Sequence, residues 1–80
     1  MYKHPLQYKK EDLDELMFKP IKLYVGPANK DEVSEILYGK IIKCSLAANP
    51  PHLPVDLEFQ MDDGQKRTFN FFEVKKFEDQ

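Results

Sequence analysis

Residues 55–77 read VDLEFQMDDGQKRTFNFFEVKKF, and this segment specifies the fold more strongly than any other part of the chain. From Val55 to Met61, apolar side chains alternate with polar ones, which is typical of a β-strand with one buried and one solvent-facing side. Asp63-Gly64 interrupts the alternation where a tight turn needs a positive φ, and residues 66–72 can form the returning strand. The segment therefore predicts a β-hairpin.

The residues after the hairpin predict a turn and a last strand. The spacing F-x-V-x-x-F that begins at Phe72 places Glu73 in a turn and returns Val74 and Phe77 to the core. We expect a single 3₁₀ turn there, followed by a strand near residues 75–78.

Before the hairpin, residues 47–54 read AANPPHLP and contain three prolines in eight residues. Because proline fixes φ and lacks a backbone donor, this segment is predicted to be a loop. Its stiffness makes it a spacer between strands rather than a flexible tether.

The segment before this loop admits two interpretations over residues 30–38. As a helix, it would begin at Asn29, complete a capping box at Glu32 and end with Gly39 as the C′ residue. As a strand, it would continue into the strand that residues 40–46 predict under either interpretation, with Gly39 at a bulge or bend. The sequence leaves both interpretations open. The strand interpretation places five side chains on one face: Ile36, Tyr38, Ile42, Cys44 and Leu46.

The N-terminal end is predicted to be an arm outside the folded domain. Residues 1–10 are polar and mixed, without sustained periodicity, and we expect a flexible arm from which Leu6 or Tyr8 docks on the domain. Residues 11–80 are then predicted to form a single small β-rich domain.

A short helix is predicted over residues 11–18. Leu13, Leu16 and Met17 recur at positions i, i+3 and i+4 and would form one apolar face. Pro20 should end the helix, because the residue before a proline disfavours helical backbone. So short a helix needs to pack on the sheet to be stable.

These elements together predict the fold class. A first strand is expected at residues 21–25, where apolar and polar side chains alternate up to Gly26-Pro27. One short N-terminal helix and about four or five strands indicate a mainly β (α+β) fold, either a small SH3-like or Sm-like antiparallel barrel or a highly curved sheet. If residues 33–38 were helical, the same strands would form an open α+β sheet with that helix on one face.

Three short patterns resemble a known family. They are G-K-I-I-K at residues 39–43, L-E-F-x-x-D-D-G at residues 57–64 and T-F-x-F-x-x-V-x-x-F at residues 68–77. This layout resembles the C-terminal half of small YolD-like bacterial and phage proteins. We carry no function, cofactor or site residue over from the resemblance.

Size and composition narrow the classes of function. The chain has 80 residues and an apolar share of 41%, which allows one compact core near the lower size limit for a domain without disulfides or metals. The single cysteine, Cys44, cannot form an internal disulfide, which fits a reducing compartment. No apolar run reaches the roughly 18–20 residues that span a bilayer, and no apolar region follows the N-terminal charges. We therefore expect a cytoplasmic location and no membrane partner.

No motif indicates catalysis, a cofactor or a metal. His4, Cys44 and His52 are the only soft ligands, and none has the spacing of a zinc site. Cys44 and His52 are the candidate thiol–imidazole pair, and on an alternating strand Cys44 should point inward. Asp62 and Asp63 suit a turn better than acid–base catalysis. We expect a protein that is not an enzyme and holds neither metal nor cofactor.

Aromatic side chains on both faces of the sheet predict an apolar patch. On the returning strand Phe69 and Phe71 are expected on one face and Phe72 on the other, while Tyr24 interrupts the polar side of the first strand. In so small a domain some of these rings should stay exposed for a partner. We therefore predict a non-enzymatic module for protein–protein interaction or self-association, with Tyr24 and Phe72 as anchors. The short, disulfide-free chain would suit a bacterial or phage accessory protein.

Basic residues on three predicted strands indicate a second possible function, the binding of nucleic acid. The net charge of −2 is unlike that of a dedicated nucleic-acid module, yet neighbouring strands could bring these residues into a stripe that neutralises phosphates. The simpler interpretation is that they pair across strands with Asp56, Glu58 and Asp62. The alternative function is a nucleic-acid-associated regulatory module that uses Lys40, Lys43, Lys66, Arg67, Lys75 and Lys76.

Overall fold

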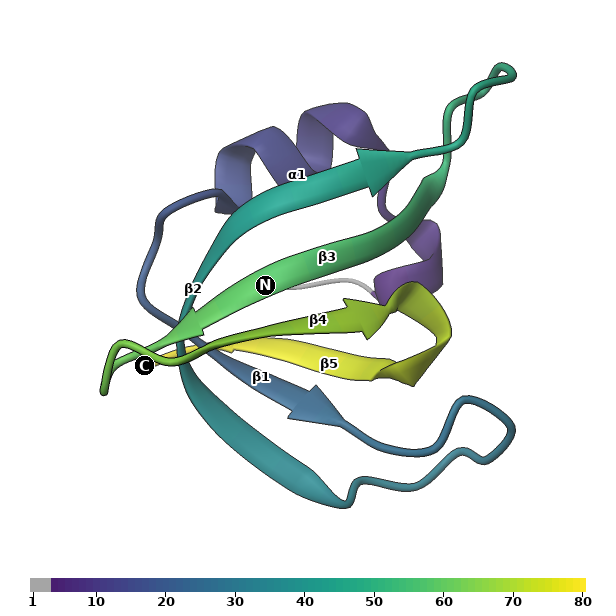
Figure 1. The fold of residues 1–80 in the computed structure, drawn as a ribbon. Helices are drawn as coiled ribbons and strands as arrows, with labels where there is room; N and C mark the ends of the chain where they lie inside the picture. Colours follow the sequence, from purple (N-terminus) through teal and green to yellow (C-terminus); the bar gives the residue numbers. More distant parts are fainter. Residues whose placement is uncertain (1–3) are drawn as a thin grey trace.

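Five antiparallel strands form one sheet in the computed structural model, which describes residues 4–80. Figure 1 shows that the sheet is strongly curved and that the long strand β2 (Glu35–Leu46) curves with it. Within the described residues no ladder joins the edge strands β4 and β5, so the sheet stays open. This arrangement confirms a mainly β fold with a highly curved sheet and a short N-terminal helix. In the order β4-β3-β2-β1-β5, the strands are Lys66–Asn70, Pro54–Met61, Glu35–Leu46, Ile21–Val25 and Val74–Asp79.

The predicted hairpin is confirmed as β3 and β4. Leu57 lies opposite Phe69 in the ladder, and both side chains are buried. The turn contains Gly64 with a φ of 95°, a conformation that glycine adopts without a steric penalty. The alternation along this segment therefore set both the register and the buried side.

The returning strand ends at Asn70, two residues before the predicted end. Asn70 caps a 3₁₀ turn, η2 (Phe71–Glu73): its side-chain Oδ1 accepts a hydrogen bond of 2.9 Å from the Phe72 N–H. Glu73 closes the cap by accepting the Asn70 N–H at 2.9 Å. Local capping thus ends β4 early, whereas the predicted 3₁₀ turn and last strand are both confirmed.

Residues 35–46 form one strand of twelve residues, so the helical interpretation of residues 30–38 is wrong. The first half of β2 pairs with β1 and the second half with β3, while Gly39 pairs on both sides. A Cβ atom at Gly39 would collide with the backbone carbonyl oxygen of Gln60, which explains why glycine occupies this bend. Long-range pairing on both sides outweighs the local capping signal that favoured a helix.

The predicted face of β2 is also wrong in its first half. Leu37 packs against the core and Ile41 is fully buried, whereas Ile36 and Tyr38 point outward. A bulge after Ile41 shifts the register, and Cys44 beyond it is only partly buried. The bulge was not visible in the sequence.

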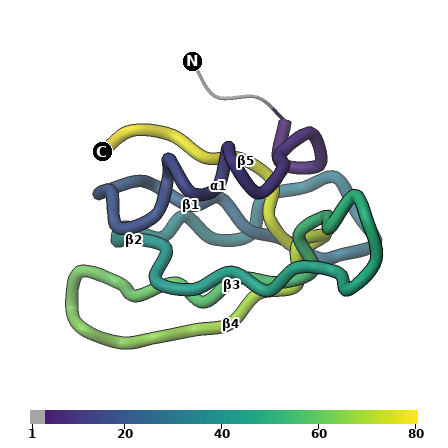
Figure 2. Tube along the Cα trace, turned by 90° about the horizontal axis from the view of Figure 1, so that it is seen from above, coloured from purple at the N-terminus to yellow at the C-terminus, as the bar shows by residue number. Residues whose placement is uncertain are grey.

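The N-terminal segment packs on the sheet through two short helices, η1 (Pro5–Gln7) and α1 (Lys10–Leu16). Tyr8 is buried and meets the ring of Phe77 edge-on, with 5.0 Å between ring centroids, whereas Leu6 remains 57% exposed. Residues 1–3 of the predicted arm lie outside the described residues. Figure 2 shows this N-terminal segment and the β3–β4 hairpin on opposite sides of the molecule.

The helix predicted over residues 11–18 ends earlier, at Leu16. Phe18 has a φ of 65° and its N–H donates a hydrogen bond of 3.0 Å to the carbonyl oxygen of Ile41. This contact with β2, rather than Pro20, ends the helix. The loop predicted over residues 47–54 is present between β2 and β3 as residues 47–53, and Pro54 is already the first residue of β3. The core consists of Tyr8, Leu13, Leu16, Ile21, Leu23, Val25, Ile41, Leu57, Phe59, Phe69, Phe71, Val74 and Phe77.

Candidate interaction surface

The outward side of β1 and its two neighbouring strands forms one continuous surface. On β1, Lys22 lies between Tyr38 of β2 and Glu78 of β5. Tyr24 lies in the same way between Ile36 and Lys76. Directly opposed residues of antiparallel strands project to the same side of a sheet. We call this surface the Tyr38 face, and it consists of Lys22, Tyr24, Ile36, Tyr38, Lys76 and Glu78.

The apolar part of the Tyr38 face is exposed. Tyr38 is 50% and Ile36 46% exposed, and Tyr24 beside them is half-buried. Of these three residues, only Tyr24 was predicted from the sequence to face outward. The sequence does contain a signal for the other two. If Leu37, Gly39 and Ile41 face the core, the alternation of a strand places Ile36 and Tyr38 on the solvent side.

The charged part of the Tyr38 face is centred on the carboxylate of Glu78. It accepts hydrogen bonds from the Tyr24 hydroxyl at 2.8 Å and from the ammonium groups of Lys76 and Lys22 at 3.0 and 3.1 Å. The Lys76 ammonium also lies 5.4 Å from the centroid of the Tyr24 ring. Three donors thus share one carboxylate and fix the position of the Tyr24 ring.

The same contacts change the acidities of the three groups. Hydrogen bonds from Lys76, Tyr24 and Lys22 lower the pKa of Glu78 to about 2. The hydrogen bond to Glu78 raises the pKa of Tyr24 and that of Lys22. At neutral pH this part of the face therefore holds two positive charges and one negative charge.

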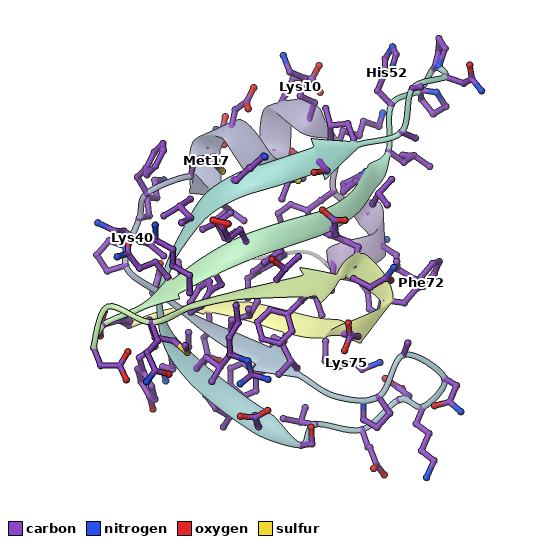
Figure 3. All side chains as sticks on the ribbon, in the orientation of Figure 1. Lys10, Met17, Lys40, His52, Phe72 and Lys75 are labelled. Carbon is purple, nitrogen blue, oxygen red and sulfur yellow. The ribbon has the colours of Figure 1, made fainter. Side chains whose placement is uncertain are left out.

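Phe72, the second predicted anchor, lies on a different surface. It is 61% exposed on η2 and projects from the edge of the molecule (Figure 3). It borders a hollow of about 340 Å³ that Leu6 and Lys75 also line and that Tyr24 does not reach. The two predicted anchors are therefore not brought together.

The six basic residues occur in separate settings rather than in one stripe. The Arg67 guanidinium forms two hydrogen bonds of 3.0 and 3.2 Å with Glu35 and lies 4.8 Å from the centroid of the Phe69 ring. Lys75 donates to the carbonyl oxygens of Lys30 and Phe72 at 2.6 and 2.9 Å. The side chains of Arg67 and Lys75 therefore bind other residues of this chain, and Lys76 belongs to the Tyr38 face.

The remaining lysines, Lys40, Lys43 and Lys66, lie on the outward side of β2 and β4. Lys43 lies opposite Glu58, whereas Lys40 and Lys66 lie on either side of Gln60. Figure 3 shows Lys40 on the left of the molecule and Lys75 well apart from it, to the lower right of the centre. The basic residues of the nucleic-acid alternative are thus divided among at least three places.

The candidate catalytic residues are also apart. Cys44 borders a hollow of about 110 Å³ between α1 and β2, and His52 is not among the residues lining it. The pKa of Cys44 is raised to about 11 by partial burial and by the charges of Asp56 and Asp14, so the thiol is protonated at neutral pH. His52 lies on the projecting proline loop, with its Nδ1 3.0 Å from the Ala47 carbonyl oxygen (Figure 3).

Residues 4–80 show neither a cluster of metal-binding side chains nor a helix suited to a membrane. In this part of the chain, no three His, Cys, Asp or Glu side chains gather closely enough to hold a metal ion. None of its helices combines the length and the apolar character that crossing a membrane requires.

Comparisons of the chain with family models, with curated proteins and with solved structures find no match. The resemblance to YolD-like proteins therefore carries no argument below.

Proposed function

We propose that this protein is a non-enzymatic module that binds a protein partner through the Tyr38 face. The observation that carries the proposal is the exposure of Tyr38 and Ile36 beside Tyr24 on a face built entirely from paired strands. Burial of aromatic side chains dominates the energetics of interfaces, and a rigid sheet loses little conformational entropy on binding. Phe72 is a second anchor, on a separate surface.

Several finer features belong to the same proposal. The strand order and the 3₁₀ turn before β5 support an SH3-like topology for the curved sheet. The unpaired, protonated thiol of Cys44 supports a reducing, cytoplasmic location and the absence of catalysis. A bacterial or phage accessory role is consistent with the small size of the chain.

Affinity capture tests the proposed function. The immobilised protein is incubated with nuclease-treated and untreated host lysate, in parallel with an Ile36→Ser/Tyr38→Ser variant. We expect the wild-type protein to retain the same protein in both lysates and the variant to lose it. A Lys43→Ser/Lys66→Ser variant, changed on the opposite part of the sheet, serves as the matched control and should retain it.

Other outcomes would contradict the proposal. Equal loss of the captured protein in both variants would show that the Tyr38 face is not the binding site. Capture that disappears with nuclease treatment, together with a steep loss of binding to DNA or RNA as salt rises, would favour the nucleic-acid alternative.

A further inference from the structure

The Tyr38 face is basic in a chain whose net charge is −2. It holds Lys22 and Lys76 against the single carboxylate of Glu78. The next outward side chain along β2 is Lys40, which is exposed. This surface therefore has the opposite sign to the chain as a whole.

Several acidic residues lie away from the face. The first turns of α1 contain Glu11, and the outward side of β3 presents Asp56 and Glu58. Glu35, at the start of β2, is neutralised by Arg67. Asp62, which follows β3, lies beside the face, because its N–H donates a hydrogen bond of 2.9 Å to the Tyr38 carbonyl oxygen. With Lys40 and Asp62 included, Lys22, Lys40 and Lys76 stand against Glu78 and Asp62, so the surface keeps a net positive charge.

The lysines of the face keep hydrogen-bonding capacity. An ammonium group carries three donors, and Glu78 takes one from Lys22 and one from Lys76. The side chain of Lys76 is 58% exposed. Carboxylates of a partner could therefore bind without breaking the contacts to Glu78.

Apolar and basic groups lie close together on the face. Lys22 is directly opposite Tyr38, and neighbouring strands are about 4.8 Å apart. Adjacent residues of a bound segment could then place an apolar side chain on Ile36 and Tyr38 and a carboxylate near Lys22. From this juxtaposition we propose that the Tyr38 face binds an acidic protein segment that also carries apolar side chains. The proposal rests on the proposed function and specifies its partner.

The details of the face favour a protein segment over a nucleic acid. Single-strand binding surfaces stack successive bases on the faces of several aromatic rings. The Tyr24 ring is half-buried, its hydroxyl is held by Glu78, and the Lys76 ammonium lies 5.4 Å from its centroid. Tyr38 is then the only ring of the face that is free to stack.

Selection from a library of random 12-residue peptides tests the proposal. The wild-type protein is the bait, and a Tyr38→Ser variant, shown by circular dichroism to be folded, removes peptides that bind elsewhere. We expect the Tyr38-dependent peptides to be enriched in Asp or Glu next to aromatic or aliphatic residues. Tyr38-dependent peptides without an acidic bias would overturn the proposed partner and leave the proposed function standing. The absence of any Tyr38-dependent peptide would overturn both.

Binding of the best selected peptide, measured by fluorescence anisotropy, provides the charge test. We expect Lys22→Gln/Lys76→Gln to weaken binding at least tenfold and the control Lys43→Gln/Lys66→Gln to change it less than twofold. Equal weakening by the two variants would overturn the proposal. Competition by single-stranded oligothymidylate as strong as by the peptide, or a concentration-dependent dimer that excludes the peptide, would assign the face to nucleic acid or to a second copy.

Discussion

The two halves of β2 obey the same pairing rules but differ on their outward sides. Before Gly39, the outward side chains are Ile36 and Tyr38, and both are about half exposed. After Gly39, they are Lys40 and Lys43, as expected for a solvated strand. The fold requires only the inward residues of either half, so the apolar outward side of the first half needs another explanation. The proposed binding of a partner would supply it.

Truncation of an isoleucine on each side of β2 should give the largest contrast. Ile41→Ala removes a fully buried side chain and should lower the free energy of unfolding by about 2–5 kcal/mol. Ile36→Ala, on the outward side, should change it by no more than about 0.5 kcal/mol. Urea denaturation followed by circular dichroism measures both.

Because the whole domain has a margin of only about 3–5 kcal/mol, Ile41→Ala could unfold it. Ile41→Val then gives a measurable loss of about 0.5–1.5 kcal/mol. Equal losses at positions 36 and 41 would show that Ile36 is part of the core, and the contrast between the two halves would fail.

The boundary between the halves is the next test. Gly39→Ala places a methyl group against the Gln60 carbonyl oxygen and should cost about 1–3 kcal/mol, because the ladder to β3 must shift. Gly64→Ala meets no atom within 4 Å, so its cost, about 1–2 kcal/mol, comes only from the positive φ. Amide chemical shifts distinguish the two variants: Gly39→Ala should perturb β3, whereas Gly64→Ala should perturb only the turn. A Gly39→Ala protein with unchanged β3 shifts would contradict the close approach.

These contrasts show which parts of the structure could be predicted from the sequence. The hairpin was predictable because the alternation and Asp63-Gly64 are local signals that agree with each other. The first half of β2 was not, since Asn29 and Glu32 form a plausible helix cap and the partner strand β1 is distant in sequence. The register that assembles the Tyr38 face depends on long-range pairing, so only Tyr24 could be singled out in advance.

The charged part of the Tyr38 face gives a smaller, spectroscopic effect. Lys76 is the main cause of the low pKa of Glu78, so Lys76→Gln should raise that pKa from about 2 toward the ordinary value of about 4.3. Because the pKa is lower in the folded protein, Glu78 stabilises the fold above about pH 4.3, and this contribution is lost as the pH falls toward 2. Carboxyl ¹³C shifts followed by NMR measure the titration. An unchanged Glu78 pKa in Lys76→Gln would mean that the ion pair does not form in solution.

The smallest effect concerns Tyr24 alone. Glu78→Gln removes the carboxylate that accepts the Tyr24 hydroxyl hydrogen bond, so the raised pKa of Tyr24 should fall toward its ordinary value of about 10. The ring ¹³C shifts of Tyr24 during a pH titration report the change. Glu58→Gln, on the outward side of β3, is the matched control and should leave the Tyr24 titration unchanged. Equal shifts in both variants would indicate a general charge effect rather than a direct contact.

Site-specific photocrosslinking tests most directly whether the first half of β2 presents a binding surface. Photoreactive p-benzoylphenylalanine is placed at position 38 or, as the control, at the exposed position 68 of β4, and each protein is irradiated in host lysate. We predict a discrete protein adduct from position 38 and none from position 68. The same adducts from both positions, or none from position 38, would contradict a partner-binding Tyr38 face.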